Sequence, residues 1–130
     1  MILLDTSALA KLLVDERESS ELRTALANES ADRQAFAISR VAVIELRRLG
    51  IRFHLAVENV EAVLRPFRIL RLTEAMMQLA ARLPFRHLGT LDALHVATAL
   101  AAEARGLLTY DARQGEAAEA EGLVVTQPGH

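Results

Sequence analysis

The chain of 130 residues contains no cysteine, which excludes disulfide bonds and thiolate metal sites and suits a reducing compartment. It also has no apolar run long enough to cross a membrane. Its first residues lack the basic start of a secretory signal peptide. We therefore expect a cytoplasmic protein that makes no contact with a membrane.

An excess of charge of one sign is missing as well. The net charge is −2, so charge alone does not indicate a nucleic-acid-binding protein. The only lysine is Lys11, and the other cations are arginines, whose planar guanidinium suits bidentate contacts with phosphate. Candidates for such contacts are Arg47, Arg48, Arg86 and Arg113, although a solvated surface position is the default for each.

The chain is rich in apolar residues, which make up 52% of the sequence. At this length, that content is enough for one domain with its own core. No internal repeat, low-complexity segment or long linker divides it. We expect a domain over residues 1–126, followed by a short tail at 127–130.

Short apolar runs alternate with segments of helical periodicity. Strands are expected at 2–4, 35–38, 67–72, 107–110 and 123–126, and helices at 6–14, 20–28, 41–49, within 51–65, from 73 to 83, at 90–105 and within 111–121. Ser39 and Thr73 are predicted helix N-caps, Gly50 and Gly106 are predicted to end helices, and 29–33 is a predicted polar loop. We expect 90–105 to be the longest helix. This alternation predicts an α/β fold with a mostly parallel central sheet and helices on both faces.

The first strand ends on a carboxylate. Ile2, Leu3 and Leu4 form a continuous apolar run of the kind found in fully buried strands, and Asp5 follows at its carboxyl end. In open α/β sheets, ligands bind at that edge. The alternative is that Asp5 only caps the next helix, since aspartate is a good N-cap.

Three further carboxylates stand out. Glu45 shares a helix face with Val41 and Leu49, which places a carboxylate inside an apolar stripe unless it reaches solvent or an arginine. Asp92 lies in the first turn of a helix, where an interaction with the helix dipole is the simpler explanation. Asp111 follows the fourth strand, where a turn residue is the simpler explanation.

Taken together, the four carboxylates suggest a common site. Clustered carboxylates repel one another, so a cluster persists when a cation neutralises it. Oxygen ligands without cysteine favour Mg²⁺ or Mn²⁺ over zinc. Such a metal activates water and neutralises a phosphodiester. The pattern therefore predicts hydrolytic nuclease chemistry.

Four segments carry a resemblance to a known family. The chain resembles the PIN-domain nucleases, and specifically the VapC toxins of type II toxin–antitoxin pairs, over residues 1 to about 126. The matching segments are ILLDTSAL at 2–9, VIELRR at 43–48, LDALHVATAL at 91–100 and LTYD at 108–111. No segment is specific alone, but their order and spacing are those of the family.

The resemblance implies a Mg²⁺- or Mn²⁺-dependent endoribonuclease. Asp5 and Asp92 match the principal metal ligands, Glu45 and Asp111 match the other acidic positions, and Ser7 matches a hydroxyl that supports the site. Family members act on RNA, pair with a cognate antitoxin protein and usually form homodimers, so we expect these partners here.

Other classes fit the residues less well. A phosphatase of the haloacid-dehalogenase type needs a second acid two residues after Asp5, where this chain has Ser7. A phosphoacceptor receiver domain needs a late lysine, and the only lysine is Lys11. Two alternatives stay open: a PIN-type nuclease of general RNA maturation, and a non-catalytic, metal-stabilised protein-interaction module. His95 is expected to be a core or supporting residue rather than a metal ligand.

Overall fold

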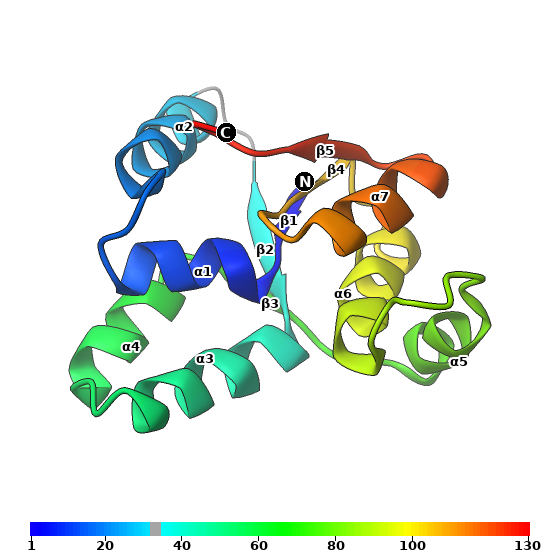
Figure 1. Ribbon diagram of the computed structural model, residues 1–130, viewed down its shortest axis with the longest axis horizontal. Coiled ribbons are helices and arrows are strands. Elements are labelled where there is room, and N and C mark those ends of the chain that lie inside the picture. The colour runs from blue at the N-terminus through cyan, green and yellow to red at the C-terminus, as the bar shows by residue number, and fades with distance from the viewer. Residues whose placement is uncertain (32–34) are drawn as a thin grey trace.

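The computed structural model describes residues 1–31 and 35–130. Its sheet contains β1 (Ile2–Leu4), β2 (Phe36–Ser39), β3 (Arg68–Leu70), β4 (Gly106–Leu108) and β5 (Val124–Thr126). The strand order is β3-β2-β1-β4-β5, and every neighbouring pair is parallel (Figure 1). The predicted α/β fold with a parallel central sheet is confirmed.

Helices cover both faces of the sheet. They are α1 (Thr6–Leu13), α2 (Ser19–Ala31), α3 (Arg40–Arg52), α4 (Val57–Leu64), α5 (Glu74–Arg82), α6 (Thr90–Ala101) and α7 (Ala112–Ala120). The first four pack on one face, and α6 and α7 pack on the other with α5 beside α6 (Figure 1). None of the helices in the described part of the chain has the length and apolarity needed to cross a membrane.

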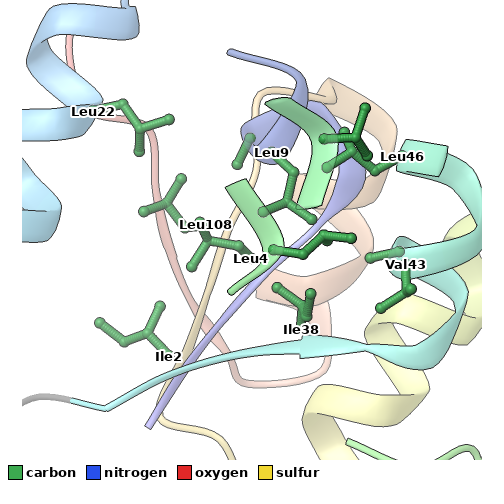
Figure 2. Close-up of a cluster of buried hydrophobic side chains, with 12 residues drawn as sticks. Ile2, Leu4, Leu9, Leu22, Ile38, Val43, Leu46 and Leu108 are labelled. Carbon is green, nitrogen blue, oxygen red and sulfur yellow. The ribbon is translucent and has the colours of Figure 1, made fainter. Parts of the chain in front are cut away.

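The apolar run of β1 serves both layers. Ile2 and Leu4 belong to the core shared with α1 to α4 (Figure 2), whereas Leu3 packs with Leu107 and Val96 in the opposite core. Successive side chains of a strand point to opposite faces, so a central strand that is covered twice is apolar at every position. This burial fixes the position of Asp5 at the end of β1.

Two glycines do not end helices as predicted. Helix α3 continues through Gly50 to Arg52. A glycine is needed at position 50 because α4 packs closely there, and a Cβ would lie 2.6 Å from Val60 Cγ2. Gly106 instead begins β4, where a Cβ would lie 2.5 Å from the Val124 carbonyl oxygen. Both glycines are explained by close packing rather than by helix termination.

The helix lengths also differ from the prediction. Helix α6 ends at Ala101 with 12 residues, so α2 and α3, with 13 each, are longer. Helix α2 extends to Ala31, so the predicted loop is wrong for 29–31, and its remainder, 32–33, lies outside the described residues. The buried residues of α2 are Ser19 and Leu22, near its start, so no apolar period marked its end.

The N-cap predictions are confirmed. Ser39 Oγ accepts a hydrogen bond from the Ala42 amide at 3.1 Å, and Thr73 Oγ1 accepts one from the Met76 amide at 3.2 Å. Each hydroxyl satisfies a backbone donor that the first helical turn leaves free.

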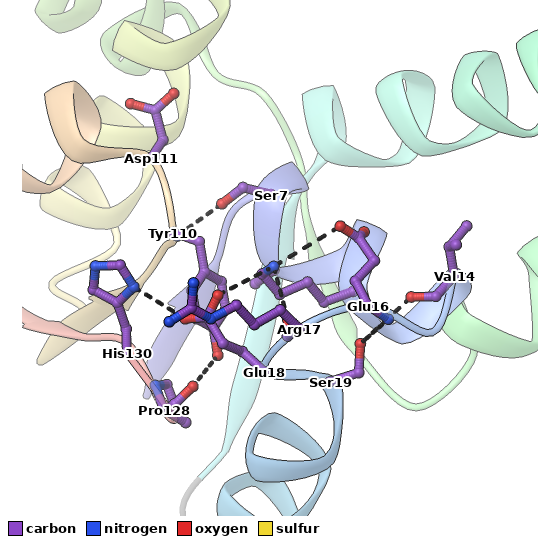
Figure 3. A network of polar contacts seen from close by, with 12 residues as sticks. Ser7, Val14, Glu16, Arg17, Glu18, Ser19, Tyr110, Asp111, Pro128 and His130 are labelled. Atoms are coloured by element: carbon purple, nitrogen blue, oxygen red, sulfur yellow. Dashed lines mark hydrogen bonds and ion pairs between the residues drawn. The ribbon is translucent and has the colours of Figure 1, made fainter.

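The last four residues pack against the domain. The Tyr110 hydroxyl donates to the Pro128 carbonyl at 2.8 Å, and His130 Nδ1 lies 3.1 Å from Glu18 Oε2 (Figure 3). Glu18 also pairs with Lys11 Nζ at 3.5 Å, and this ammonium lies over the Tyr110 ring. The segment after β5 is therefore tied to the loop after β4 and to the turn that follows α1.

Candidate active site

The strand order places two of the predicted carboxylates at the carboxyl edge of the sheet. β1 and β4 are parallel neighbours, so Asp5 and Asp111, which follow them, emerge at the same edge. The helices that follow, α1 and α7, pack on opposite faces. The connections therefore diverge at this point, and such a switch point is where α/β folds bind ligands.

Asp5 is buried, with 1% of its surface exposed. Its Oδ1 accepts hydrogen bonds from the Ser7 hydroxyl at 2.6 Å and the Ala8 amide at 3.1 Å, and its Oδ2 accepts one from the Thr109 hydroxyl. Burial raises the pKa of Asp5, and these hydrogen bonds oppose the rise. Asp5 does cap α1, but a carboxylate has about four acceptor positions, so Oδ2 keeps one for another ligand.

Two hydroxyls join the loops after β1 and β4. Ser7 Oγ accepts a hydrogen bond from the Tyr110 amide at 2.9 Å (Figure 3). Thr109 Oγ1 accepts one from the Asp111 amide at 3.0 Å. Both hydroxyls also donate to Asp5, so they fix its rotamer and hold the two loops together. Sequence reasoning named Ser7 but not Thr109, whose partner lies more than 100 residues away.

Glu45 projects from α3 toward the same edge. Its Oε1 accepts hydrogen bonds from the Thr6 hydroxyl at 2.7 Å and from His95 Nε2 at 2.7 Å. Burial disfavours the ionised form, but the hydrogen bonds from His95 and Thr6 outweigh it and hold the pKa of Glu45 below its usual value. No arginine among residues 1–31 and 35–130 pairs with Glu45, and Arg47 pairs with Glu61 at 2.9 Å. The Glu45 side chain is 25% exposed, so the alternative that it reaches solvent is partly met.

His95 anchors Glu45 from inside the core. The ring is 1% exposed, and its Nδ1 lies 3.0 Å from Ser39 Oγ. An ionised carboxylate only accepts, so Nε2 carries the hydrogen that Glu45 receives. Ser39 Oγ also accepts from the Ala42 amide, so both ring nitrogens of His95 have a polar partner inside the core. The prediction of a core or supporting histidine is confirmed.

Asp92 and Asp111 are linked through Gln114. The Gln114 amide donates to Asp111 Oδ1 at 2.9 Å, and its side-chain Nε2 donates to Asp92 Oδ1 at 3.1 Å. Gln114 is 1% exposed. Sequence reasoning missed it, although a glutamine three residues after a capping residue is a known helix-start signal.

The other three carboxylates act electrostatically on Asp92. The pKa of Asp92 is raised by burial first, then by the negative charges of Asp111, Glu45 and Asp5, while a positive charge on His95 lowers it. Hydrogen bonds link the same segments, since Thr109 contacts the Asp5 carboxylate and the Asp111 backbone amide, and Gln114 contacts the carboxylates of Asp111 and Asp92. The four positions predicted from the sequence therefore lie in one region.

The donor chemistry of this region suits a hard divalent cation. No group of three or more His, Cys, Asp or Glu side chains among residues 1–31 and 35–130 is arranged to hold a metal ion. Mg²⁺, however, usually keeps several waters and binds through one or two carboxylates. The hydrogen bonds to Glu45, Asp92 and Asp111 each engage a single oxygen, which leaves the second oxygen for such a hydrated ion.

Comparisons with known proteins agree with this architecture. The PIN domain family profile matches residues 2–120. Ribonuclease VapC47 of Mycobacterium tuberculosis is 37% identical over 133 aligned residues, which cover 99% of this chain and 98% of that protein.

Two solved structures share the fold. One is Mycobacterium tuberculosis VapC20, described as a Sarcin-Ricin loop cleaving toxin, with a TM-score of 0.75 and 18% identity over 98% of this chain and 100% of that one. The other is a toxin-antitoxin complex from Klebsiella pneumoniae, with a TM-score of 0.73 and 23% identity over 98% of each chain. The sequence and fold together establish that this chain belongs to the PIN-domain family and to the VapC group within it.

Proposed function

We propose that this chain is a metal-dependent endoribonuclease that acts as the toxin of a toxin–antitoxin pair. The observation that supports the proposal is that Asp5 and Asp111 follow neighbouring parallel strands, with Asp92 near enough to be affected by the charges of Asp5, Glu45 and Asp111. Similarity to a protein named as a ribonuclease, over nearly the whole chain, supports RNA as the substrate.

Asp5 and Asp92 would hold Mg²⁺, with Mn²⁺ as the alternative. When bound, such an ion lowers the pKa of a coordinated water and offsets the negative charge of a phosphodiester. The residues around Asp5 keep its carboxylate in one rotamer, since Ser7, Ala8 and Thr109 all donate to it. Preorganisation of this kind removes the cost of ordering the site during the reaction.

Glu45 and Asp111 complete the site. Hydrogen bonds to Oε1 of Glu45 keep this carboxylate ionised at neutral pH, and they leave Oε2 to orient a water molecule and accept its proton. Asp111 is held through Oδ1 by the Gln114 backbone amide, so its Oδ2 is also left to orient a water molecule. The attacking water is then directed by two carboxylates from different segments of the chain.

Two protein partners belong to the proposal. A structural neighbour is a toxin-antitoxin complex, which supports a cognate antitoxin. Exposed apolar side chains support a homodimer, among them Ile51 (62%), Phe53 (58%) and Val57 (68%), because large exposed apolar groups favour association. Light scattering of the purified chain, alone and with the protein encoded beside its gene, measures both assemblies.

The experiment that tests the activity compares wild type with Asp5→Asn. Asparagine also caps helices well, so α1 stays capped while the charge is removed. Cleavage of RNA in Mg²⁺ should fall by about 10²-fold or more, the usual effect of losing one preorganised electrostatic group. Asp15→Asn is the matched control, because the Asp15 side chain is 86% exposed and its removal should change nothing. A near wild-type rate for Asp5→Asn contradicts the assignment.

Cleavage assays and expression of the chain also distinguish the proposal from its two alternatives, a protein-interaction module and a nuclease of general RNA maturation. A protein-interaction module would bind its partner without cleaving any RNA in Mg²⁺ or Mn²⁺. A nuclease of general RNA maturation would cleave RNA, but its expression alone would leave growth unaffected. We expect expression of the chain alone to arrest growth, co-expression of the neighbouring gene product to restore it, and the cleaved RNA ends to share one sequence.

A further inference from the structure

One surface hollow contains Glu45, and a second lies between the segments that lead into Asp92 and follow Asp111; each contains arginines that pair with no carboxylate among the described residues. We propose that they bind RNA on the two sides of the cleaved bond, so that the strand runs from α3, past the carboxylates, to the start of α7. This inference rests on the proposed ribonuclease function and assigns the residues that hold the substrate.

The first hollow, of about 410 Å³, lies between the starts of α1 and α6 and the side of α3. It is lined by Thr6 and Glu45, which belong to the site, and by Arg48 and Arg52. Residues 45, 48 and 52 follow a helical spacing of three and four, which puts them on one face. A phosphate bound to these arginines therefore lies next to the Glu45 carboxylate.

The second hollow, of about 430 Å³, lies between the loop at 84–88 and α7. Its lining includes Phe85, Arg86, His87 and Arg113, together with the acidic Glu116. The loop leads directly into the first turn of α6, which carries Asp92, and Arg113 follows Asp111 by two residues. Arginines beside aromatic rings are the combination that binds single-stranded nucleic acid, because bases stack on rings while guanidinium groups contact phosphates.

The two hollows lie on either side of the start of α6. Leu91 lines the first and Leu88 lines the second, and Asp92 follows both in the sequence. Both volumes fall within the range of small-ligand sites, so each accommodates a nucleotide-sized group. The proposed path joins the two hollows past the first turn of α6, which carries Asp92.

The four arginines of the two hollows carry charge that no neighbouring carboxylate offsets. No carboxylate in the described part of the chain pairs with Arg48, Arg52, Arg86 or Arg113, and all four are exposed. Arg23, Arg47 and Arg105 are paired with Asp15, Glu61 and Glu29. Further arginines without an ion pair among the described residues line neither hollow, so position as well as charge selects the four; these are Arg17, Arg40, Arg68, Arg71 and Arg82. A polyanion beside four carboxylates needs local cations, and these four arginines supply them from the two hollows.

A larger hollow of about 630 Å³ does not compete for the RNA. It lies between α2, α4 and the start of β2, its lining is mostly apolar, and it contains none of the four carboxylates. Its position at the opposite edge of the sheet keeps it away from the reacting groups.

Three double variants test the path. The first is Arg48→Ala with Arg52→Ala, the second is Arg86→Ala with Arg113→Ala, and the control is Arg47→Ala with Arg65→Ala. Each removes two positive charges from exposed positions, so net charge changes equally and thermal melts should show folded proteins. In the control pair, Arg47 of α3 and Arg65 at the end of α4 both act on Glu61 of α4, and neither arginine lines either hollow.

The first measurement is binding of a short, labelled, single-stranded RNA of mixed sequence in EDTA at several KCl concentrations. Each phosphate contact on a single strand adds about 0.7 to the slope of log K against log salt. Each test pair should lower this slope by about 1.4, twice the single-contact value, and the control pair should leave it unchanged. Phe85→Leu should weaken binding roughly tenfold through lost stacking without changing the slope.

The second measurement is cleavage in Mg²⁺. Contacts made equally in ground and transition states raise KM and leave kcat unchanged when lost, and we expect this pattern for both test pairs. Wild-type binding by either test pair, or an equal loss in the control pair, overturns the path. If wild type cleaves RNA and Asp5→Asn does not, a failure of the arginine variants to behave as expected overturns the path and leaves the proposed function standing. If wild type cleaves no RNA, the proposed function fails, and the path fails with it.

Discussion

Replacing Asp92 by asparagine should stabilise the fold while it removes activity. The asparagine side chain keeps an oxygen that can accept the hydrogen bond from Gln114, so the substitution removes charge and little else. The charge it removes is unfavourable, because burial and the carboxylates of Asp111, Glu45 and Asp5 all raise the pKa of Asp92. Functional sites often store such strain, and its relief separates stability from activity.

Two opposing effects determine how much Asp92→Asn changes the free energy of unfolding. Interactions between partly exposed charges are each worth roughly 0.2–1 kcal/mol, and three of them oppose ionised Asp92. Asp92 also lies in the first turn of α6, where a negative charge gains roughly 0.3–1 kcal/mol from the helix dipole. The net gain in the free energy of unfolding should be about 1 kcal/mol. For a chain of this length, that corresponds to a rise in Tm of about 4 °C.

The gain in stability of Asp92→Asn over wild type should grow as the pH rises from acid to neutral. The folded pKa of Asp92 lies above its ordinary value of 3.8, so folding favours the protonated form. The penalty of ionised Asp92 is therefore absent below pH 3.8, grows as the pH rises through the folded pKa, and is complete at neutral pH. Asp92→Asn should melt higher than wild type at neutral pH in EDTA and match it in acid.

Magnesium supplies the second measurement. An ion that binds the native state at 100 times its dissociation constant stabilises it by about 2.7 kcal/mol, and Asp92→Asn should gain much less than wild type. Glu58→Gln is the matched control, since Glu58 is an exposed acid in the first turn of α4; it should melt slightly lower than wild type and keep the full response to Mg²⁺. A lower-melting Asp92→Asn with an undiminished Mg²⁺ shift would refute the carboxylate cluster.

Three further outcomes are expected. Gly50→Ala should lower the denaturant midpoint, because the new methyl would lie 2.6 Å from Val60 Cγ2 and overpacking costs roughly 1–3 kcal/mol, which exceeds the gain of about 1 kcal/mol in helix propensity. His95→Leu should lower the free energy of unfolding in urea by roughly 1–3 kcal/mol, since buried polar partners lose their hydrogen bonds. It should also change kcat more than KM, because Glu45 loses the hydrogen bond that positions it. Light scattering should give a dimer at tens of micromolar, and a stable monomer there counts against the homodimer.

The sequence by itself determined the elements and their edges. Unbroken apolar runs predict buried strands because a strand covered on both faces has no solvated side. The place where the first run ends fixed Asp5 at a strand terminus, and N-cap chemistry fixed Ser39 and Thr73 at helix starts. The predicted strand at 107–110 is too long at its end, because β4 stops at Leu108 and Asp111 caps α7 instead. These signals are local, so they can be read without knowing which strands are neighbours.

Only the tertiary structure decided the contacts between distant segments. It made β1 and β4 neighbours, which put Thr109 on Asp5, Gln114 on Asp92 and His95 on Glu45. None of these pairs has a local signal, because each joins residues far apart in the chain.

Packing also decided which contacts single residues make. Arg47 and Arg48 are equivalent in sequence, but a helix turns by about 100° per residue, so one pairs with Glu61 and the other lines the hollow beside Glu45. Gly50 is indistinguishable in sequence from a helix terminator until α4 packs against it. The sequence determined which residue types were available at each element, and the distance between elements determined what each residue contacts.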